Sequence, residues 1–239
     1  EAIAHRLKPA VSGFLMEKEL QFLGNAVNAP VRPFVALLGG AKISGKIDLI
    51  EALLPKVDHI LVGGAMACTF FKAMGFEVGN SLVELDRVEM AKDLIAKAGS
   101  KLVLPSGARI AERLEEHAVT RGVPRDGIPV GWAMFDIDAS SVMQFSAIIA
   151  GARTVIWNGP MGVFEMPPFD AGTMGVARAL ASATTSGAIT IVGGGDSAAA
   201  IVAAGLESQV THVSTGGGAS LEFLEGKPLP GVEALDNAP

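Results

Sequence analysis

The chain has 239 residues, of which 49% are hydrophobic and 18% are charged, a balance that excludes a disordered, fibrous or coiled-coil protein. Its 19 Lys and Arg residues against 25 Asp and Glu give a net charge of −6 at pH 7, which does not indicate a surface for nucleic acid or anionic membrane. The single cysteine, Cys68, excludes an intrachain disulfide framework and a zinc cluster built on cysteines, and it favours a reducing compartment.

Short apolar runs alternate along the chain with amphipathic stretches, as strands alternate with crossover helices. The runs are apolar throughout rather than at every second position, which is typical of parallel strands covered on both faces. The predicted strands are Phe34–Leu38, His59–Val62, Lys101–Leu104, Thr154–Trp157, Ile189–Val192 and Thr211–Val213. The predicted helices include Met16–Ala26, Asp48–Leu54 and Asp86–Ala98, and Thr120–Gly131 is predicted as a long surface loop.

This order predicts an α/β fold: a doubly wound, Rossmann-like parallel sheet of about six strands with helices on both faces, in one domain over residues 1–239. The longest charge-free stretches, Ala139–Ala152 and Ala179–Gly195, fall short of the roughly 18 apolar residues of a membrane span, so we expect a soluble protein. Residues 1–6, with no basic and apolar leader, are typical of the middle of a helix or connector, so we expect a fragment of a longer chain.

Many of the 29 glycines come directly after predicted strands. That edge of an open α/β sheet binds ligands, because glycine lets backbone N–H groups approach a phosphate and the next helix offers its positive end. A lone Gly-Gly pair fits an ordinary tight turn, but two runs of three glycines favour close approach to an anion, with a polyphosphate as the natural candidate. The five turns are Gly39–Lys46, Gly63–Met66, Asn158–Glu165, Gly193–Ser197 and Ser214–Ser220.

Four side chains in these turns carry charges suited to a nucleotide, and each also has an ordinary structural interpretation. Lys42 and Lys46 would supply point charges for phosphate oxygens, or Lys46 is a solvated residue at a helix start. Asp196 is either an oxygen ligand for phosphate-bound Mg²⁺ or a helix N-cap. Glu165 either accepts hydrogen bonds from ribose hydroxyls or is a simple loop carboxylate.

Two familiar fingerprints fit only in part. Residues 40–47 match the P-loop pattern up to Ile47, which stands where Ser or Thr would bind Mg²⁺. Residues 193–198 match the dinucleotide pattern, but the carboxylate expected about 20 residues later is absent, since Glu207 comes too early. A distinct α/β enzyme of the dinucleotide type therefore stays as an alternative.

In order and spacing, the motifs closely resemble the C-terminal, nucleotide-binding half of phosphoglycerate kinases over essentially the whole chain. The segments that carry the resemblance are Leu7–Leu20, Gly39–Lys42, Trp157–Glu165, Gly193–Asp196 and Ser214–Glu222. The resemblance implies reversible phosphoryl transfer between 1,3-bisphosphoglycerate and ADP, giving 3-phosphoglycerate and ATP with Mg²⁺, in glycolysis or carbon fixation. It also implies a monomeric full-length enzyme of the cytoplasm, or alternatively the chloroplast stroma, with neither nucleic acid nor membrane as a partner.

The resemblance further implies roles for individual residues. Lys42 is similar to the lysine that neutralises the transferring phosphoryl group, and Gly217 and Gly218 to the helix start that receives it. The residues implied to bind nucleotide are Lys46 and Asn158 at the phosphates, Gly194, Gly195 and Ser197 at the phosphate-binding helix start, Asp196 as Mg-nucleotide ligand, Glu165 at the ribose, and Gly63, Gly64 and Phe135 beside adenine.

The family's N-terminal, phosphoglycerate-binding domain has no counterpart here, and residues 1–15 are similar to the interdomain connector. We therefore expect nucleotide binding without efficient turnover by this chain alone, the alternative being a noncatalytic nucleotide-binding fragment or regulatory module. Residues 229–235 resemble the tail that returns toward the other domain, so we expect exposed apolar area. Four departures from the family pattern, at Gly45, Met134, Phe135 and Asp138, are expected to alter loop geometry or nucleotide affinity, with Met134 and Phe135 adding bulk near adenine.

Overall fold

The computed structural model describes residues 2–236 and contains a six-stranded sheet in the order β3-β2-β1-β7-β8-β9. All neighbouring strands in this sheet are parallel. The strands are β1 (Phe34–Leu38), β2 (His59–Val62), β3 (Leu102–Val103), β7 (Thr154–Asn158), β8 (Ile189–Gly193) and β9 (His212–Val213). The predicted doubly wound sheet is confirmed, and its strand order reverses between the adjacent strands β1 and β7.

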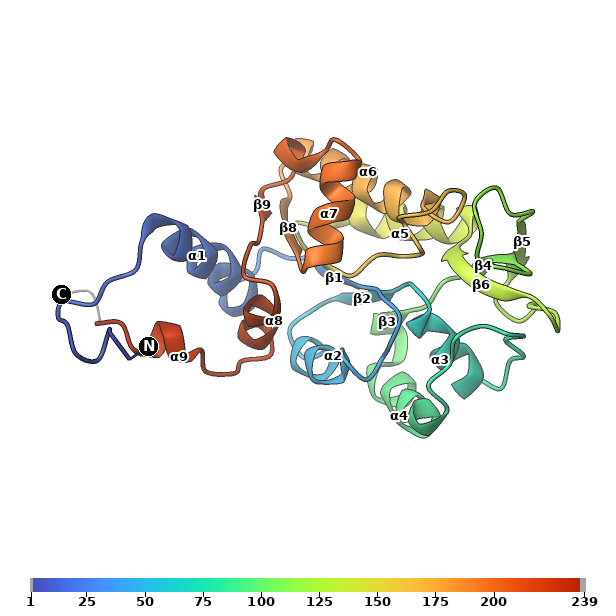
Figure 1. The fold of residues 1–239 in the computed structure, drawn as a ribbon, viewed down its shortest axis with the longest axis horizontal. Coiled ribbons are helices and arrows are strands. Elements are labelled where there is room, and N and C mark those ends of the chain that lie inside the picture. Colours follow the sequence, from blue (N-terminus) through green and yellow to red (C-terminus); the bar gives the residue numbers. More distant parts are fainter. Residues whose placement is uncertain (1, 237–239) are drawn as a thin grey trace.

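Helices cover both faces of this sheet (Figure 1). On one face lie α2 (Ile47–Leu53), α3 (Met66–Ala73) and α4 (Val88–Ala98), and on the other lie α5 (Ala139–Gly151), α6 (Ala171–Thr185) and α7 (Gly195–Ala203). The central strand β1 is buried along its whole length. Buried residues of α4 recur at helical spacing, at Ala91, Leu94 and Ala98, which is why this stretch forms a helix against the core. Short 3₁₀ turns occur at η1 (Leu85–Arg87), η2 (Gly99–Lys101) and η3 (Glu207–Gln209).

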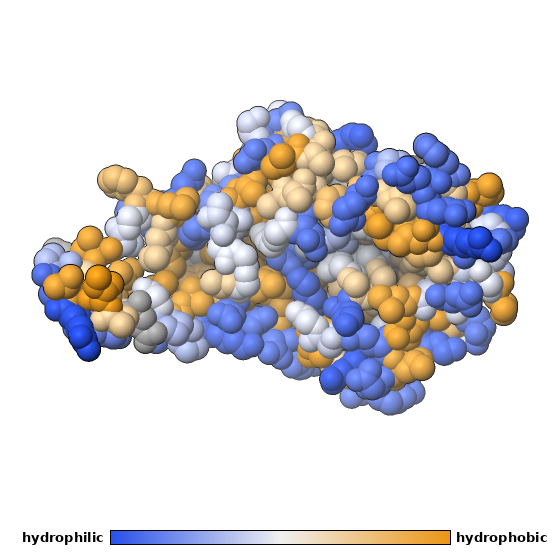
Figure 2. All heavy atoms as spheres, viewed as in Figure 1, coloured by the Kyte–Doolittle hydropathy of each residue, from blue (hydrophilic) through white to orange (hydrophobic). Residues whose placement is uncertain are grey.

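The helices α1 (Phe14–Asn28), α8 (Gly218–Leu224) and α9 (Pro230–Glu233) lie together at one end of the molecule, at the left of Figure 1. Two hydrogen bonds join Ala10 to Asp236 there: the Ala10 N–H donates to Asp236 Oδ2 at 2.9 Å, and the Asp236 N–H donates to the Ala10 carbonyl at 2.8 Å. The tail over residues 229–235 has no exposed large hydrophobic side chain, contrary to the expectation drawn from it, and the exposed apolar area at this end lies instead on residues 3–16. Figure 2 shows hydrophobic atoms gathered there.

A second, three-stranded antiparallel sheet has the order β5-β4-β6 and was not predicted. Its strands are β4 (Gly107–Ala111), β5 (Arg121–Pro124) and β6 (Ala133–Ile137). The prediction of a surface loop over Thr120–Gly131 is wrong for Arg121–Pro124, which pairs with β4. This strand is mostly exposed and contains Gly and Pro, so its composition indicates a turn, and only its edge pairing makes it a strand.

Candidate functional site

The carboxyl ends of β1, β7, β8 and β9 lead into one pocket of about 330 Å³, which we call the glycine pocket. It lies at the reversal of the strand order, where open α/β sheets bind their ligands. The residues that line it are Gly39, Gly40, Ala41, Lys42, Lys46, Asn158, Gly159, Pro160, Gly194, Gly195, Asp196, Ser197, Gly217, Gly218 and Leu221.

The turns after β1 and β7 touch each other at the base of this pocket. The Gly39 N–H donates to the Asn158 carbonyl at 2.9 Å, and the Gly40 N–H donates to the Pro160 carbonyl at 2.9 Å. Gly159 has φ +97°, and a Cβ there would lie 2.2 Å from the Gly39 carbonyl oxygen. The two backbones can therefore approach this closely only because these positions are glycine.

Lys46 and Asn158 link the two sides of the glycine pocket. Lys46 precedes α2, and its ammonium group contacts Asn158 Oδ1. Asn158 is 2% exposed, and its Nδ2 donates to the Gly193 carbonyl at 2.8 Å. Burial lowers the pKa of Lys46, while the negative charges of Asp196 and Glu225 oppose that shift. Lys46 is thus a half-buried lysine facing a polar pocket, and its interpretation as a freely solvated residue is wrong.

The third wall is the start of α7. Gly194 is the N-cap residue with φ +90°, and Ser197 Oγ accepts a 2.5 Å hydrogen bond from the Gly159 N–H. Asp196 is the second residue of the helix, is exposed, and the helix has no side-chain cap. The N-cap interpretation of Asp196 is therefore wrong, and its carboxylate faces the pocket next to the amide groups of the first helical turn.

Nine of the thirteen residues proposed from the sequence line the glycine pocket: Lys42, Lys46, Asn158, Gly194, Gly195, Asp196, Ser197, Gly217 and Gly218. The other four, Gly63, Gly64, Phe135 and Glu165, do not line it. Gly63 and Gly64 are buried against neighbouring turns, since a Cβ on Gly64 would lie 2.4 Å from the Gly40 carbonyl oxygen. Phe135 is half-buried against Phe169 with ring centroids 5.0 Å apart, and Glu165 is exposed. Their assignment to adenine and ribose stays a prediction.

Two of the four departures from the family pattern, Asp138 and Met134, have a structural role. Asp138 caps α5, since its Oδ1 accepts a 2.9 Å hydrogen bond from the Ser141 N–H. Met134 is buried in the core with its sulfur 3.6 Å from Cys68 Sγ, and the bulk that it would add near adenine stays a prediction. Gly45 is exposed, and a Cβ there would meet no atom within 4 Å, so this glycine is not required by close packing.

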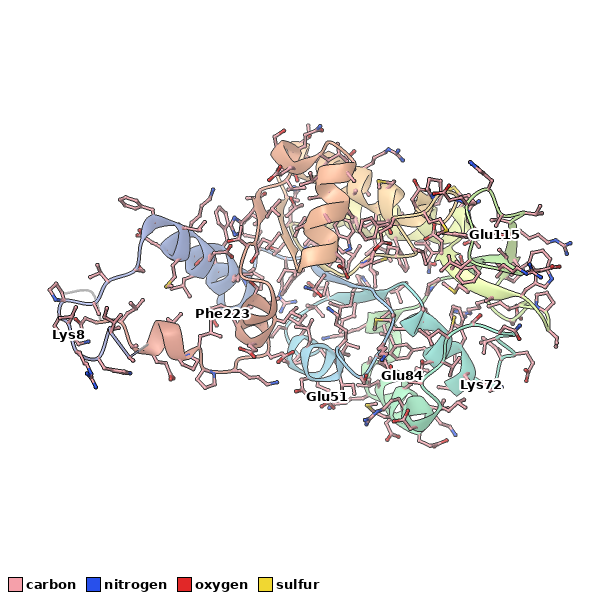
Figure 3. The ribbon with its side chains drawn as sticks, in the orientation of Figure 1. Lys8, Glu51, Lys72, Glu84, Glu115 and Phe223 are labelled. Atoms are coloured by element: carbon pink, nitrogen blue, oxygen red, sulfur yellow. The ribbon has the colours of Figure 1, made fainter. Side chains whose placement is uncertain are left out.

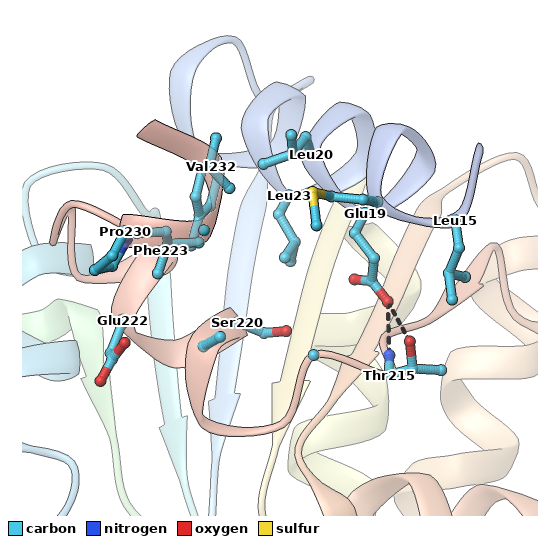
Figure 4. A pocket seen from close by; sticks show the side chains of 15 residues that line it. Leu15, Glu19, Leu20, Leu23, Thr215, Ser220, Glu222, Phe223, Pro230 and Val232 are labelled. Carbon is cyan, nitrogen blue, oxygen red and sulfur yellow. Dashed lines mark hydrogen bonds between the residues drawn. The ribbon is translucent and has the colours of Figure 1, made fainter. Parts of the chain in front are cut away.

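A second, apolar pocket of about 370 Å³ lies between α1, α8 and the segment that leads into α9 (Figure 4). Glu19 lies at its polar end, where Oε1 accepts hydrogen bonds from the Thr215 N–H at 2.6 Å and from Thr215 Oγ1 at 3.1 Å. Glu19 Oε2 is 3.2 Å from His212 Nε2. Partial burial opposes ionisation of Glu19, but contacts from Thr215, Ser214 and His212 lower its pKa. The sequence carried no signal for this contact, because Glu19 and Thr215 are 196 positions apart.

Within residues 2–236, no group of three or more His, Cys, Asp or Glu side chains is placed to hold a metal ion. No helix in the same range is both long and apolar enough to cross a membrane.

The fold and the pocket define a doubly wound α/β domain with a glycine-lined, lysine-bearing crevice at its switch point. A model of the phosphoglycerate kinase family matches residues 1–227 of the chain. The chain belongs to the phosphoglycerate kinase family.

Named relatives agree with this assignment. The chain is 57% identical to a phosphoglycerate kinase of Chloroherpeton thalassium, covering 100% of this chain and 61% of the relative. It is 54% identical to a chloroplastic phosphoglycerate kinase of Volvox carteri, covering 99% of this chain and 52% of the relative. The solved structure of phosphoglycerate kinase from Coxiella burnetii superposes with a TM-score of 0.91 at 41% identity, covering 97% of this chain and 60% of that one. The chain therefore spans about 60% of the length of these bacterial relatives.

Proposed function

We propose that this chain provides the Mg-nucleotide site of a phosphoglycerate kinase. The reaction is reversible phosphoryl transfer between 1,3-bisphosphoglycerate and ADP, giving 3-phosphoglycerate and ATP, in glycolysis or carbon fixation. The observation that carries the proposal is the convergence of Lys42, Lys46 and the start of α7 on one pocket at the switch point of the sheet.

The pocket has the parts that phosphoryl transfer needs, which are positioning and neutralisation of charge rather than covalent chemistry. Lys46 would hold nucleotide phosphates, since Asn158 fixes its ammonium group inside the pocket. Lys42 is exposed on the loop before α2 and would neutralise the phosphoryl group in transit. Gly217 and Gly218, at the start of α8, would leave room for that group beside backbone amides.

The residues of the pocket fit a magnesium ion that enters with the nucleotide. Asp196 presents an exposed carboxylate that is not used as a helix cap, and hard oxygen ligands of this kind suit Mg²⁺. Because the described residues contain no acidic cluster around the pocket, the remaining ligands would be phosphate oxygens and water. When bound, the ion would neutralise charge on the phosphates, while Asp196 orients the complex against α7.

Calorimetry of MgADP binding tests the site. We expect Lys46→Ala and Asp196→Ala each to weaken binding by about tenfold or more, since each removes a charged contact worth roughly 1.5–3 kcal/mol. Lys92→Ala and Asp93→Ala are matched controls, because both side chains are exposed on α4 and outside the glycine pocket. Equal affinity in all five proteins, or no binding by the wild-type chain, would contradict the proposal.

The phosphoglycerate site is proposed to lie in a domain carried by the extra length of the relatives. On this basis the chain alone binds nucleotide but turns over poorly, and a separately produced phosphoglycerate-binding half restores turnover. If the chain alone turns over about as fast as a full-length relative, without the phosphoglycerate-binding half, the proposal that the two sites lie in separate domains is refuted. Binding without restored turnover would instead support a noncatalytic nucleotide-binding module. The proposed compartment is the cytoplasm, with the chloroplast stroma as the alternative that a chloroplastic relative keeps open.

A further inference from the structure

Glu84 lies on the segment before η1 and contacts the loop that carries both lysines of the glycine pocket (Figure 3). Its Oε1 accepts a 2.5 Å hydrogen bond from Ser44 Oγ, and its Oε2 accepts a 3.1 Å hydrogen bond from the Ser44 N–H. The two residues are 40 positions apart, so this is a tertiary contact rather than a local turn.

The backbone of Glu84 is itself held in place. Its N–H donates to Thr69 Oγ1 at 3.2 Å, and Thr69 is buried on α3. Its carbonyl accepts the Arg87 N–H at 2.9 Å, which closes the η1 turn. The η1 turn has no side-chain cap, so the Glu84 carboxylate is directed to the lysine loop and not to its own helix.

Ser44 is at the centre of the loop over residues 41–46. Next to it, Ile43 is fully buried, and the Lys46 N–H donates to the Ile43 carbonyl at 2.8 Å. Lys42 and Lys46 stand two residues to either side of Ser44. Any displacement of Ser44 therefore moves the backbone from which both lysines reach the pocket.

The Glu84 carboxylate is ionised at neutral pH. Partial burial opposes ionisation, but the Ser44 hydroxyl, the Ser44 and Ile43 amides and the charge of Lys42 lower the pKa of Glu84 below its usual value. The contacts to Ser44 are thus charge-assisted hydrogen bonds, which are stronger than neutral ones.

We propose that Glu84 is a positioning residue, which holds the loop 41–46 through Ser44 so that Lys42 and Lys46 face the glycine pocket. The inference about loop order stands on the contacts of Glu84 alone. Its consequence for ligand binding rests on the proposed nucleotide site.

Hydrogen exchange of the backbone amides tests the positioning role without any ligand. In Glu84→Ala we expect the amides of residues 41–46 to exchange about tenfold faster, because the Ser44 amide loses its acceptor and the loop opens more often. The matched control is Glu89→Ala, which removes an exposed carboxylate from the first turn of α4 and leaves the lysine loop untouched. Glu84→Gln, which keeps one carbonyl acceptor, should fall between wild type and Glu84→Ala. Unchanged exchange at residues 41–46 in Glu84→Ala would overturn the proposal.

Calorimetry with MgATP then tests the link to the lysines. We expect Glu84→Ala to weaken MgATP binding by about tenfold in the wild-type background and by about threefold in the Lys42→Ala background, because only Lys46 is then left for Glu84 to position. An equal loss of MgATP affinity in both backgrounds would overturn the proposal that Glu84 acts through Lys42. If the wild-type chain binds no nucleotide, the proposed function fails, and the exchange rates alone still decide whether Glu84 orders the loop.

Discussion

The ammonium group of Lys46 contacts the Oδ1 atom of Asn158 across the point where the strand order of the sheet reverses. Asn158 ends β7, Lys46 follows β1, and Asn158 Nδ2 donates to the carbonyl of Gly193 at the end of β8. One buried amide therefore joins the ends of β7 and β8 and fixes the lysine that faces the pocket.

Removing this amide should lower both stability and ligand affinity. In Asn158→Ala the Gly193 carbonyl and the half-buried Lys46 ammonium each lose a partner, which should reduce the free energy of unfolding by about 1–3 kcal/mol. Urea denaturation measures the change. Asn25→Ala, which truncates an exposed asparagine on α1, should stay within about 0.5 kcal/mol of wild type. If the two variants are equally stable, the Asn158 contacts make no net contribution to the free energy of unfolding.

Gly159→Ala should be among the most damaging single changes in the chain. The added Cβ would lie 2.2 Å from the Gly39 carbonyl oxygen, at a residue with φ +97°. Steric overlap and backbone strain together should lower the free energy of unfolding by about 3 kcal/mol or more. The turns after β1 and β7 would have to move apart to make room for the Cβ. Gly151→Ala is the control, because a Cβ at the end of α5 meets nothing within 4 Å and should be neutral or slightly stabilising. Thermal unfolding of both variants measures the difference, and a Gly159→Ala midpoint at the wild-type value would contradict the argument.

The six parallel strands could be predicted because they are short, mainly apolar runs, and five of the six are followed by a glycine turn, as Phe34–Leu38 is by Gly39. The glycine turns also predicted most residues of the glycine pocket, because parallel strands bring their carboxyl ends to one edge of the sheet. The antiparallel sheet was missed because β5 reads Arg-Gly-Val-Pro and becomes a strand only through pairing with β4. Glu84 was missed because its partner lies 40 positions away, and a tertiary hydrogen bond leaves no spacing in the sequence.

Asp138 should stabilise α5 through its cap. Asp138→Ala removes the acceptor for the Ser141 N–H and should lower the free energy of unfolding by about 0.5–2 kcal/mol. Partial burial opposes ionisation, but hydrogen bonds from Ser141 and Ser140 lower the pKa of Asp138. The stabilisation is therefore present at neutral pH and lost as the pH falls through the lowered pKa. Urea denaturation at pH 7 and in acid measures the free energy of unfolding of Asp138→Ala and of the exposed control Asp126→Ala. If the two variants differ by the same free energy at both pH values, the predicted loss of the cap in acid is contradicted.

Asp136 is a carboxylate with no exposed surface, and it joins β6 to the start of α6. Its Oδ2 accepts the Gly172 N–H at 2.7 Å and its Oδ1 accepts the Ile137 N–H at 2.8 Å. Burial raises the pKa of Asp136 to about 8, although these amides and the charge of Arg109 act in the opposite direction. The raised pKa means that burial of the charged form is more costly here than the two hydrogen bonds can offset.

The stability of the chain should consequently fall as the pH rises from about 4 to about 8. In this range the folded chain keeps a proton on Asp136 that the unfolded chain has already released, so folding binds a proton and each pH unit costs up to about 1.4 kcal/mol. Above pH 8 both states are ionised and the slope due to this residue ends. Asp136→Asn, which cannot ionise, should flatten the slope in urea denaturation across this range, whereas the exposed control Asp126→Asn should keep it. If Asp136→Asn shows the wild-type slope, Asp136 is ionised in the folded chain and the capping amides outweigh its burial.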